Sequence, residues 1–226
     1  MKSRLAKVLV LSAAIAAIGV SAAIAAGVRN GGFERGLSGW DTSERGGGDW
    51  ASVDATRAAA IDPRLLGPKA GEREAVVSQD GPGSNLLLQD LKLKADRRHR
   101  LSLWIQYRNQ APRFASPNTF DVAGVPLSGS ARGGGPSAPD NQQLRVEVIK
   151  SSAPIRTVKQ KQILATVLRT MPGDRRNSKW HRYGVNLSRY AGKTVTLRIA
   201  EIDNLGPLLV GVDAVKLKSK RIKRGG

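Results

Sequence analysis

The chain has 226 residues, with 37 Lys and Arg against 18 Asp and Glu, no cysteine, and a formal net charge of +19 at pH 7. The absence of cysteine excludes disulfides, thiolate metal sites and thiol nucleophiles, and two histidines are too few for a histidine-rich metal site. Hydrophobic residues make up 40% of the chain, enough to bury a core, and the length favours one domain over two small ones.

Residues 1–25 have the pattern of a signal peptide. Three basic residues precede an uncharged apolar run at 8–20, and a small-residue cleavage site of the A-x-A type follows at 23–25. The alternative is an uncleaved membrane anchor, although the run is short and rich in alanine for a span. No later stretch is apolar enough to cross a bilayer, so the sequence predicts a secreted protein, in the periplasm or at the cell surface. Removing three basic and no acidic residues leaves 34 against 18, so the mature domain itself carries +16.

The mature chain shows short apolar alternations separated by Gly, Pro, Asn and Asp, a pattern typical of an all-β sandwich or jelly roll. Strands are predicted at 74–79, 84–91, 99–107, 144–150, 161–169, 179–187, 194–201 and 208–217. Residues 108–141 are predicted to be a long loop inserted in one domain of residues 27–217, because neither flank has enough strands to close a core alone. Residues 218–226 are predicted to be a basic tail, disordered beyond Lys218.

Both ends of the mature chain carry short motifs. Residues 30–34 have the sequence NGGFE, residues 36–40 have GLSGW, and residues 210–215 have VGVDAV. These motifs resemble the opening and closing strands of secreted carbohydrate-binding modules with the galactose-binding-like jelly-roll fold. Residues 99–107 resemble the family's central strand, although His99 stands where tyrosine is usual and the preceding segment lacks the family glycine. The resemblance implies a jelly-roll β-sandwich; it implies carbohydrate binding less specifically, because this fold also hosts adhesive and structural domains.

The resemblance also implies a structural calcium ion that joins the N-terminal strand to the C-terminal one. Its ligands in the family correspond here to the backbone carbonyl of Gly32 and the carboxylates of Glu34 and Asp213. Calcium is a hard cation that accepts carbonyl and carboxylate oxygens in a flexible cage. The alternative is that Glu34 caps a turn and Asp213 is a hydrogen-bonded polar residue, with no ion.

A candidate ligand-binding face lies on the strand at 99–107. Alternation places Trp104, Gln106 and Arg108 on one face and aliphatic side chains on the other. Such a face is natural for sugar binding, since an indole stacks on a sugar ring while polar neighbours bind hydroxyls. Arg145 and Arg198 are expected to extend this face from neighbouring strands. The alternative is that the 108–141 loop covers Trp104 as part of a second core, and the low aromatic content, 4%, argues against tight polysaccharide binding.

No convincing catalytic set is present in the sequence, because the acidic groupings lack an assignable partner across a cleft. We therefore expect a non-catalytic exported protein that binds a glycan or polysaccharide through one sandwich face. The alternative is a structural or adhesive envelope protein, held to anionic cell-surface polymers by its basic surface and tail. Nucleic acid is not the expected partner, since an exported protein meets envelope polymers first. Scattered arginines are also compatible with an ordinary charged surface, and nothing in the sequence indicates an oligomeric state.

Overall fold

The computed structural model describes residues 27–78, 81–122 and 139–222. The predicted signal peptide, most of the low-complexity half of the 108–141 loop and the last four residues of the predicted tail lie outside the described residues. Among the described residues, no helix is long and apolar enough to span a membrane.

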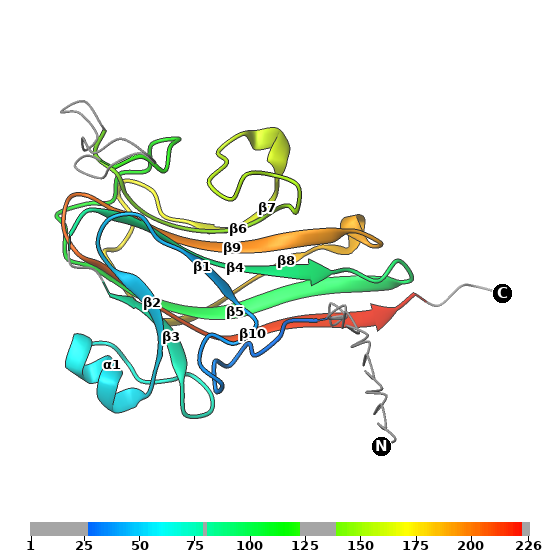
Figure 1. Ribbon diagram of the computed structural model, residues 1–226, viewed down its shortest axis with the longest axis horizontal. Coiled ribbons are helices and arrows are strands. Elements are labelled where there is room, and N and C mark those ends of the chain that lie inside the picture. Colours follow the sequence, from blue (N-terminus) through cyan, green and yellow to red (C-terminus); the bar gives the residue numbers. More distant parts are fainter. Residues whose placement is uncertain (1–26, 79–80, 123–138, 223–226) are drawn as a thin grey trace, which may run out of the picture.

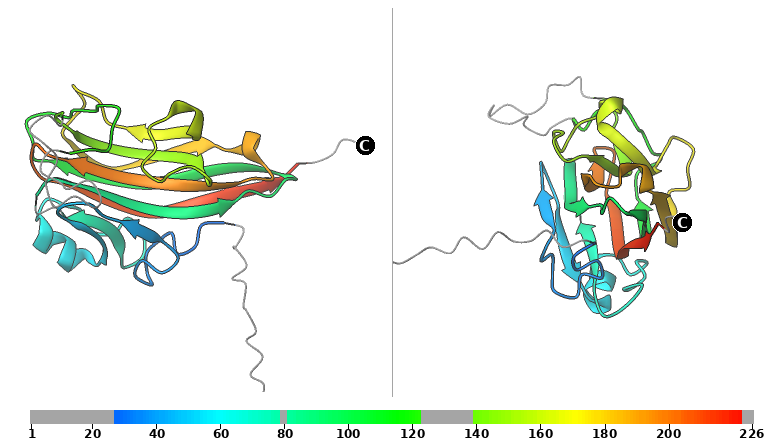
Figure 2. Two further views of the ribbon diagram at one scale, coloured as in Figure 1. Left: turned by 45° about the horizontal axis from the view of Figure 1, so that its top comes forward. Right: turned by 90° about the vertical axis from the view of Figure 1, so that its right-hand side faces the viewer.

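Two five-stranded antiparallel sheets pack face to face, and Figure 2 shows them as stacked layers. The first sheet contains, in spatial order, β1 (Asp41–Ser43), β4 (Gly83–Lys92), β9 (Thr194–Asp203), β6 (Gln142–Lys150) and β7 (Ile163–Arg169). The second sheet contains β2 (Asp49–Val53), β3 (Glu74–Ser78), β10 (Leu208–Arg221), β5 (Arg97–Asn109) and β8 (Asn177–Asn186). Helix α1 (Ala55–Ile61) follows β2 at one end of the sandwich (Figure 1), and short 3-10 helices span Gln160–Gln162 and Ser188–Tyr190. The predicted all-β sandwich is confirmed.

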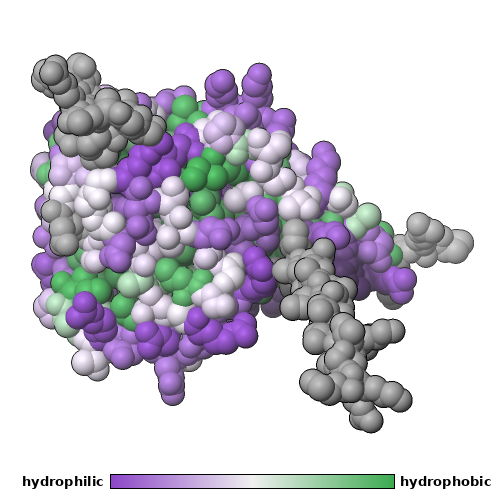
Figure 3. All heavy atoms as spheres, in the orientation of Figure 1, coloured by the Kyte–Doolittle hydropathy of each residue, from purple (hydrophilic) through white to green (hydrophobic). Residues whose placement is uncertain are grey.

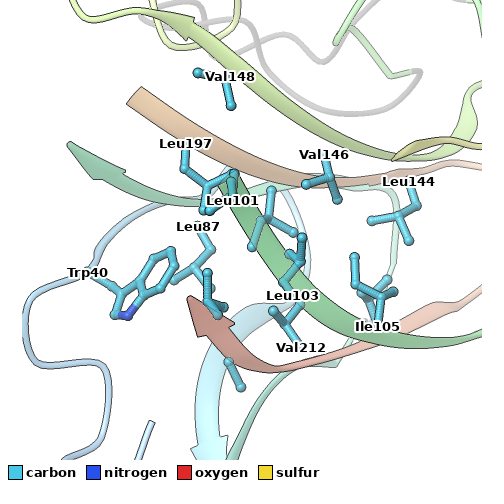
Figure 4. Packing of buried hydrophobic residues seen from close by; sticks show 14 of the residues in the cluster. Trp40, Leu87, Leu101, Leu103, Ile105, Leu144, Val146, Val148, Leu197 and Val212 are labelled. Atoms are coloured by element: carbon cyan, nitrogen blue, oxygen red, sulfur yellow. The ribbon is translucent and has the colours of Figure 1, made fainter. Parts of the chain in front are cut away.

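The core lies between the sheets and is built by the period-2 alternation of their strands. Leu101, Leu103 and Ile105 of β5 face Leu144 and Val146 of β6, and all five are fully buried (Figure 4). Burying one such side chain stabilises the fold by about 1.5–3 kcal/mol. The alternation therefore fixes which face of each strand points into the core. The opposite face of each strand points to the outside of the sandwich.

All eight predicted strands are present, with ends that differ by a few residues, and β1, β2 and α1 were not predicted. The largest difference is at the C-terminus, where β10 continues to Arg221 and pairs with β5 as far as Arg97. The predicted basic tail therefore begins as a strand. Residues 218–221 are all polar or basic, so the apolar alternation that predicts a strand is absent there. Backbone pairing with β5 nevertheless holds this segment in β10.

The predicted 108–141 loop begins as the end of β5 and leaves the strand after Asn109. In its first half, Phe120 and Val122 are buried against Leu86, Leu88 and other side chains of the first sheet. This part of the loop therefore covers the outer face of the first sheet.

Candidate functional site

The predicted ligand face, on the outer side of β5, is covered by residues 62–71, which we call the covering segment. Gln106 is buried, and its side-chain amide bonds both backbone groups of Leu66: its Oε1 accepts from the amide (2.9 Å) and its Nε2 donates to the carbonyl (2.5 Å). Arg108 donates from Nε to Oδ2 of Asp62 at 3.1 Å. The polar groups of this face therefore bond to the protein itself.

Trp104 is partly buried beneath the same covering segment. The Nζ atom of Lys69 lies 4.3 Å from the centroid of the Trp104 ring. On the next strand, the indole of Trp180 donates to the carbonyl of Gly67 at 3.0 Å. The alternative prediction that Trp104 is covered matches this arrangement, but the cover is the segment at 62–71 and not the 108–141 loop.

The structure does not bring Arg145 and Arg198 to Trp104, because these arginines lie on β6 and β9 of the first sheet. Both are fully buried and flank Glu147: Arg145 Nη2 is 2.7 Å from Glu147 Oε1, and Arg198 pairs with Glu147 Oε2. Both guanidinium groups also lie against the ring of Phe120, which belongs to the first half of the 108–141 loop. Burial lowers the pKa of Arg198. The expected single face of five residues is therefore not formed, since a strand pattern does not say to which sheet the strand belongs.

The three residues of the candidate calcium site, Gly32, Glu34 and Asp213, do converge. A Cβ atom at Gly32 would lie 3.8 Å from Oε1 of Glu34 and 3.9 Å from Oδ1 of Asp213. The backbone is strained around them: among the described residues, the only non-glycine residues with positive φ are Asn30 (46°), Phe33 (57°) and Ala214 (49°). Such strain of the backbone clusters at functional sites and persists only where the surroundings impose it.

The carboxylates of the candidate calcium site accept backbone hydrogen bonds from the covering segment and the turn after it. Ala70 donates to Oδ2 of Asp213 at 2.8 Å, and Glu72 donates to Oε1 of Glu34 at 3.0 Å. Burial raises the pKa of Asp213, and the charge of Glu34 adds to this effect. Neither carboxylate forms an ion pair within the described residues. Oε1 of Glu34 also accepts from the amide of Arg73 at 3.4 Å, which leaves its Oε2 and the carboxylate of Asp213 as the oxygens that fit a hard cation. Side chains alone do not make the site, because no group of three His, Cys, Asp or Glu suited to a metal occurs in the described part of the chain.

An open hollow of about 350 Å³ lies at the edge of the sandwich, beside β8 and the turn that precedes it. We call it the aromatic hollow, and its lining includes Tyr107, Asp174, Arg175, Asn177, His181 and Tyr183. The rings of His181 and Tyr183 meet at 4.8 Å between centroids, at an angle of 65°. Burial raises the pKa of Tyr107 to about 12, so its hydroxyl stays protonated and donates to the carbonyl of Arg175 at 3.2 Å.

Sequence reasoning missed the aromatic hollow. Its one signal is the pair His181 and Tyr183, which alternation places on one face of the predicted strand at 179–187, next to the polar turn at 172–177. The remaining wall comes from Tyr107 of β5 and Leu168 of β7, which are distant in sequence.

No protein-family model and no curated protein matches the chain. Among solved structures, the carbohydrate-binding module TmCBM61, in complex with β-1,4-galactotriose, has a TM-score of 0.50 at 13% identity; the match covers 85% of this chain and 97% of that chain. The K1 cleaved adhesin domain of Lys-gingipain from Porphyromonas gingivalis W83 has a TM-score of 0.48 at 13% identity, and the match covers 84% of this chain and 96% of that domain. An apo cyclase from Fischerella sp. has a TM-score of 0.47 at 14% identity, and the match covers 88% of this chain and 99% of the cyclase chain. At these identities the likeness shows the fold alone: this chain has the β-sandwich fold of a carbohydrate-binding module.

Proposed function

We propose that this protein is a non-catalytic module that binds a glycan in the aromatic hollow. The observation that carries the proposal is the pairing of the His181 and Tyr183 rings with the polar side chains of Asp174, Arg175 and Asn177 in one open hollow. Aromatic rings stack on the apolar faces of sugars, and a few polar groups fix their orientation. The fold shared with TmCBM61, a module that binds β-1,4-galactotriose, supports the same class of ligand.

The acid content of the aromatic hollow supports a binding role over hydrolysis. Of its lining residues in the described part of the chain, Asp174 alone carries a carboxylate. Hydrolysis of a glycosidic bond by the common mechanisms needs two carboxyl groups on either side of the bond. The proposed function therefore needs no catalysis by this chain.

Binding to β-1,4-galactotriose and to a panel of neutral oligosaccharides, measured by isothermal titration calorimetry, tests the proposal. We expect His181→Ala and Tyr183→Ala to weaken binding about tenfold or more, and Trp104→Ala to leave it unchanged. His181 is exposed, so its variant keeps the test valid if the partly buried Tyr183 proves necessary for folding. Loss of binding in Trp104→Ala, with binding kept in His181→Ala, would place the ligand at the face of β5 instead.

We also propose that the candidate calcium site holds a structural calcium ion. Gly32 would supply its carbonyl, and Glu34 and Asp213 their carboxylates. The bound ion would offset the repulsion between two carboxylates that no cation of the described chain neutralises. Its role would be to fix the N-terminal turn to β10.

The location of the protein outside the cytoplasm is part of the proposal and depends on residues 1–25. The alternative function, a structural or adhesive envelope protein held by its basic residues, is favoured by one observation: the end of β10 adds exposed lysines to one edge of the sandwich. Retention on cells that falls as salt rises, and that does not change when neutral oligosaccharide is added, would favour the alternative.

A further inference from the structure

The far ends of β5 and β10 bring like charges directly opposite each other. Lys218 of β10 pairs with Arg100 of β5, and Lys220 pairs with Arg98. All four side chains are exposed, and alternation places them on the same outer face of the second sheet. In Figure 3, hydrophilic side chains gather at the end of the molecule where β10 ends. This arrangement concentrates positive charge on two neighbouring strands.

The part of the chain that the structure describes does not compensate this charge. None of the four side chains has an ion pair within the described residues. The nearby Asp96 instead approaches Arg97 (3.9 Å) and Arg221 (3.6 Å), a cross-strand pair on the opposite face of the two strands. Like charges directly opposite each other in a sheet destabilise it. The two pairs are therefore a cost to folding.

Protection of a strand edge explains only part of the cluster. β3 pairs with β10 only at Val210–Val212, so within the described residues the end of β10 has an open edge, where lysines discourage association with other strands. Arg100 is not at an edge, because β5 pairs there with β10 on one side and with Asn186 of β8 on the other. An interior strand needs no such protection, so Arg100 points to a different use.

The four cations line a hollow of about 530 Å³, which we call the cationic hollow, together with polar residues of β8 and the turn after it. Asn186 contributes a side-chain amide to its wall, and the hydroxyl of Ser188 bonds the backbone of His99. A guanidinium group binds a carboxylate or sulfate through two parallel hydrogen bonds, while amides and hydroxyls suit sugar hydroxyls. The lining thus combines groups for an anion with groups for a sugar.

We propose that the cationic hollow binds an acidic polysaccharide, with Arg98, Arg100, Lys218 and Lys220 holding its anionic groups. The site is separate from the aromatic hollow, shares no residue with it, and does not depend on it. Single-stranded nucleic acid fits less well, because binding of bases uses exposed aromatic rings. The only aromatic ring of the lining, that of His99, is 2% exposed, and its nitrogens bond Ser219 and the carbonyl of Lys94. A concave wall also suits a single polymer chain better than a flat bilayer.

The test measures the affinity of the full chain for polygalacturonate and for dextran sulfate across a range of salt concentrations. The variant is Arg100→Ala with Lys218→Ala, and the matched control is Lys159→Ala with Lys161→Ala, which removes the same charge from exposed residues beside the first sheet. We expect the first variant to weaken binding about tenfold and to flatten the salt dependence, and the control to change it less than about threefold. Neutral galactotriose binding should not change in either, which separates this site from the aromatic hollow.

Three outcomes would overturn the proposal. Equal loss in both double variants would mean attraction to net charge rather than a site. Unchanged binding in the Arg100→Ala, Lys218→Ala variant would show that the polysaccharide does not bind in the cationic hollow. Tighter binding of an oligo-dT strand or of phosphatidylglycerol vesicles, lost in the same variant, would assign the hollow to nucleic acid or to a membrane. Both substituted residues are exposed and repel each other, so the variant should fold, as a melting temperature at or above that of the parent would demonstrate.

Discussion

The ammonium group of Lys69 lies over the ring of Trp104, 4.3 Å from its centroid. This contact is worth about 0.5–1 kcal/mol at a partly exposed site. It belongs to a row of contacts through which the covering segment bonds to β5, β8 and β10. The face that a strand pattern marks as a ligand surface is therefore a second layer of packing.

The side chain of Gln106 makes two of these contacts, so its replacement should destabilise the fold. Gln106→Ala removes both bonds to Leu66 and also the donor, at 3.0 Å, to the buried carboxyl of Glu74. Leaving buried polar groups without partners costs about 1–3 kcal/mol each. We expect a loss of at least about 2 kcal/mol in the free energy of unfolding, measured in urea. Gln110→Ala, at an exposed position after β5, should change it by less than about 0.5 kcal/mol, and equal effects would contradict the described cover.

Trp104, Gln106 and Arg108 could be placed on one strand face from the sequence, but their cover could not be predicted. The covering segment contacts Trp104 and Arg108 through the side chains of Lys69 and Asp62, but it holds Gln106 through the backbone amide and carbonyl of Leu66. Every residue has such groups, so no side-chain pattern signals them.

The candidate calcium site shows the opposite case. Gly32, Glu34 and Asp213 were inferred from motifs at the two ends of the chain, and the fold does bring these ends together. The aromatic and cationic hollows each combine residues from three or more segments that are distant in sequence. The sequence therefore could not predict that these segments come together.

Gly71 should be essential to the position of the Glu34 carboxylate. Its φ is +73°, and a Cβ atom there would lie 2.0 Å from Oε1 of Glu34. Gly36 is a matched control, since its φ is +63° but a Cβ atom would meet nothing within 4 Å. Gly36→Ala should cost about 1 kcal/mol of backbone strain, and Gly71→Ala clearly more, as measured by chemical unfolding. Equal losses would mean that the Glu34 carboxylate moves freely away.

Calcium should raise the melting temperature if the candidate calcium site holds the ion. A ligand that binds only the folded state stabilises it by RT ln(1 + [L]/Kd), which is about 2.7 kcal/mol at a hundredfold excess over Kd. We expect a chelator to lower the melting temperature of the parent chain and calcium to restore it. Glu34→Ala should melt at the lower temperature whether or not calcium is present. Glu44→Ala, at an exposed position, should respond like the parent, and a parent unaffected by chelator would refute the site.

Glu201 should make the protein less stable as pH rises. It is fully buried on β9, and burial, with the charge of Asp203 as a second cause, holds its pKa well above the ordinary value of 4.5. Between 4.5 and the pKa of the folded state, the unfolded chain has released a proton that the folded chain keeps. The contribution of Glu201 to the free energy of unfolding is therefore fully present below pH 4.5 and is lost as the pH rises through the pKa of the folded state.

The substitution Glu201→Gln isolates this effect, because glutamine keeps the oxygen that accepts from Asn85 at 3.1 Å but cannot ionise. The free energy of unfolding is measured in urea at pH 5 and pH 9. Between these two values, the free energy of the variant should rise relative to that of the parent by about 1 kcal/mol or more, since one pKa unit corresponds to about 1.4 kcal/mol. Glu44→Gln, at an exposed position, should follow the parent at both values. If the difference between Glu201→Gln and the parent is the same at both pH values, Glu201 does not hold a proton in the folded state.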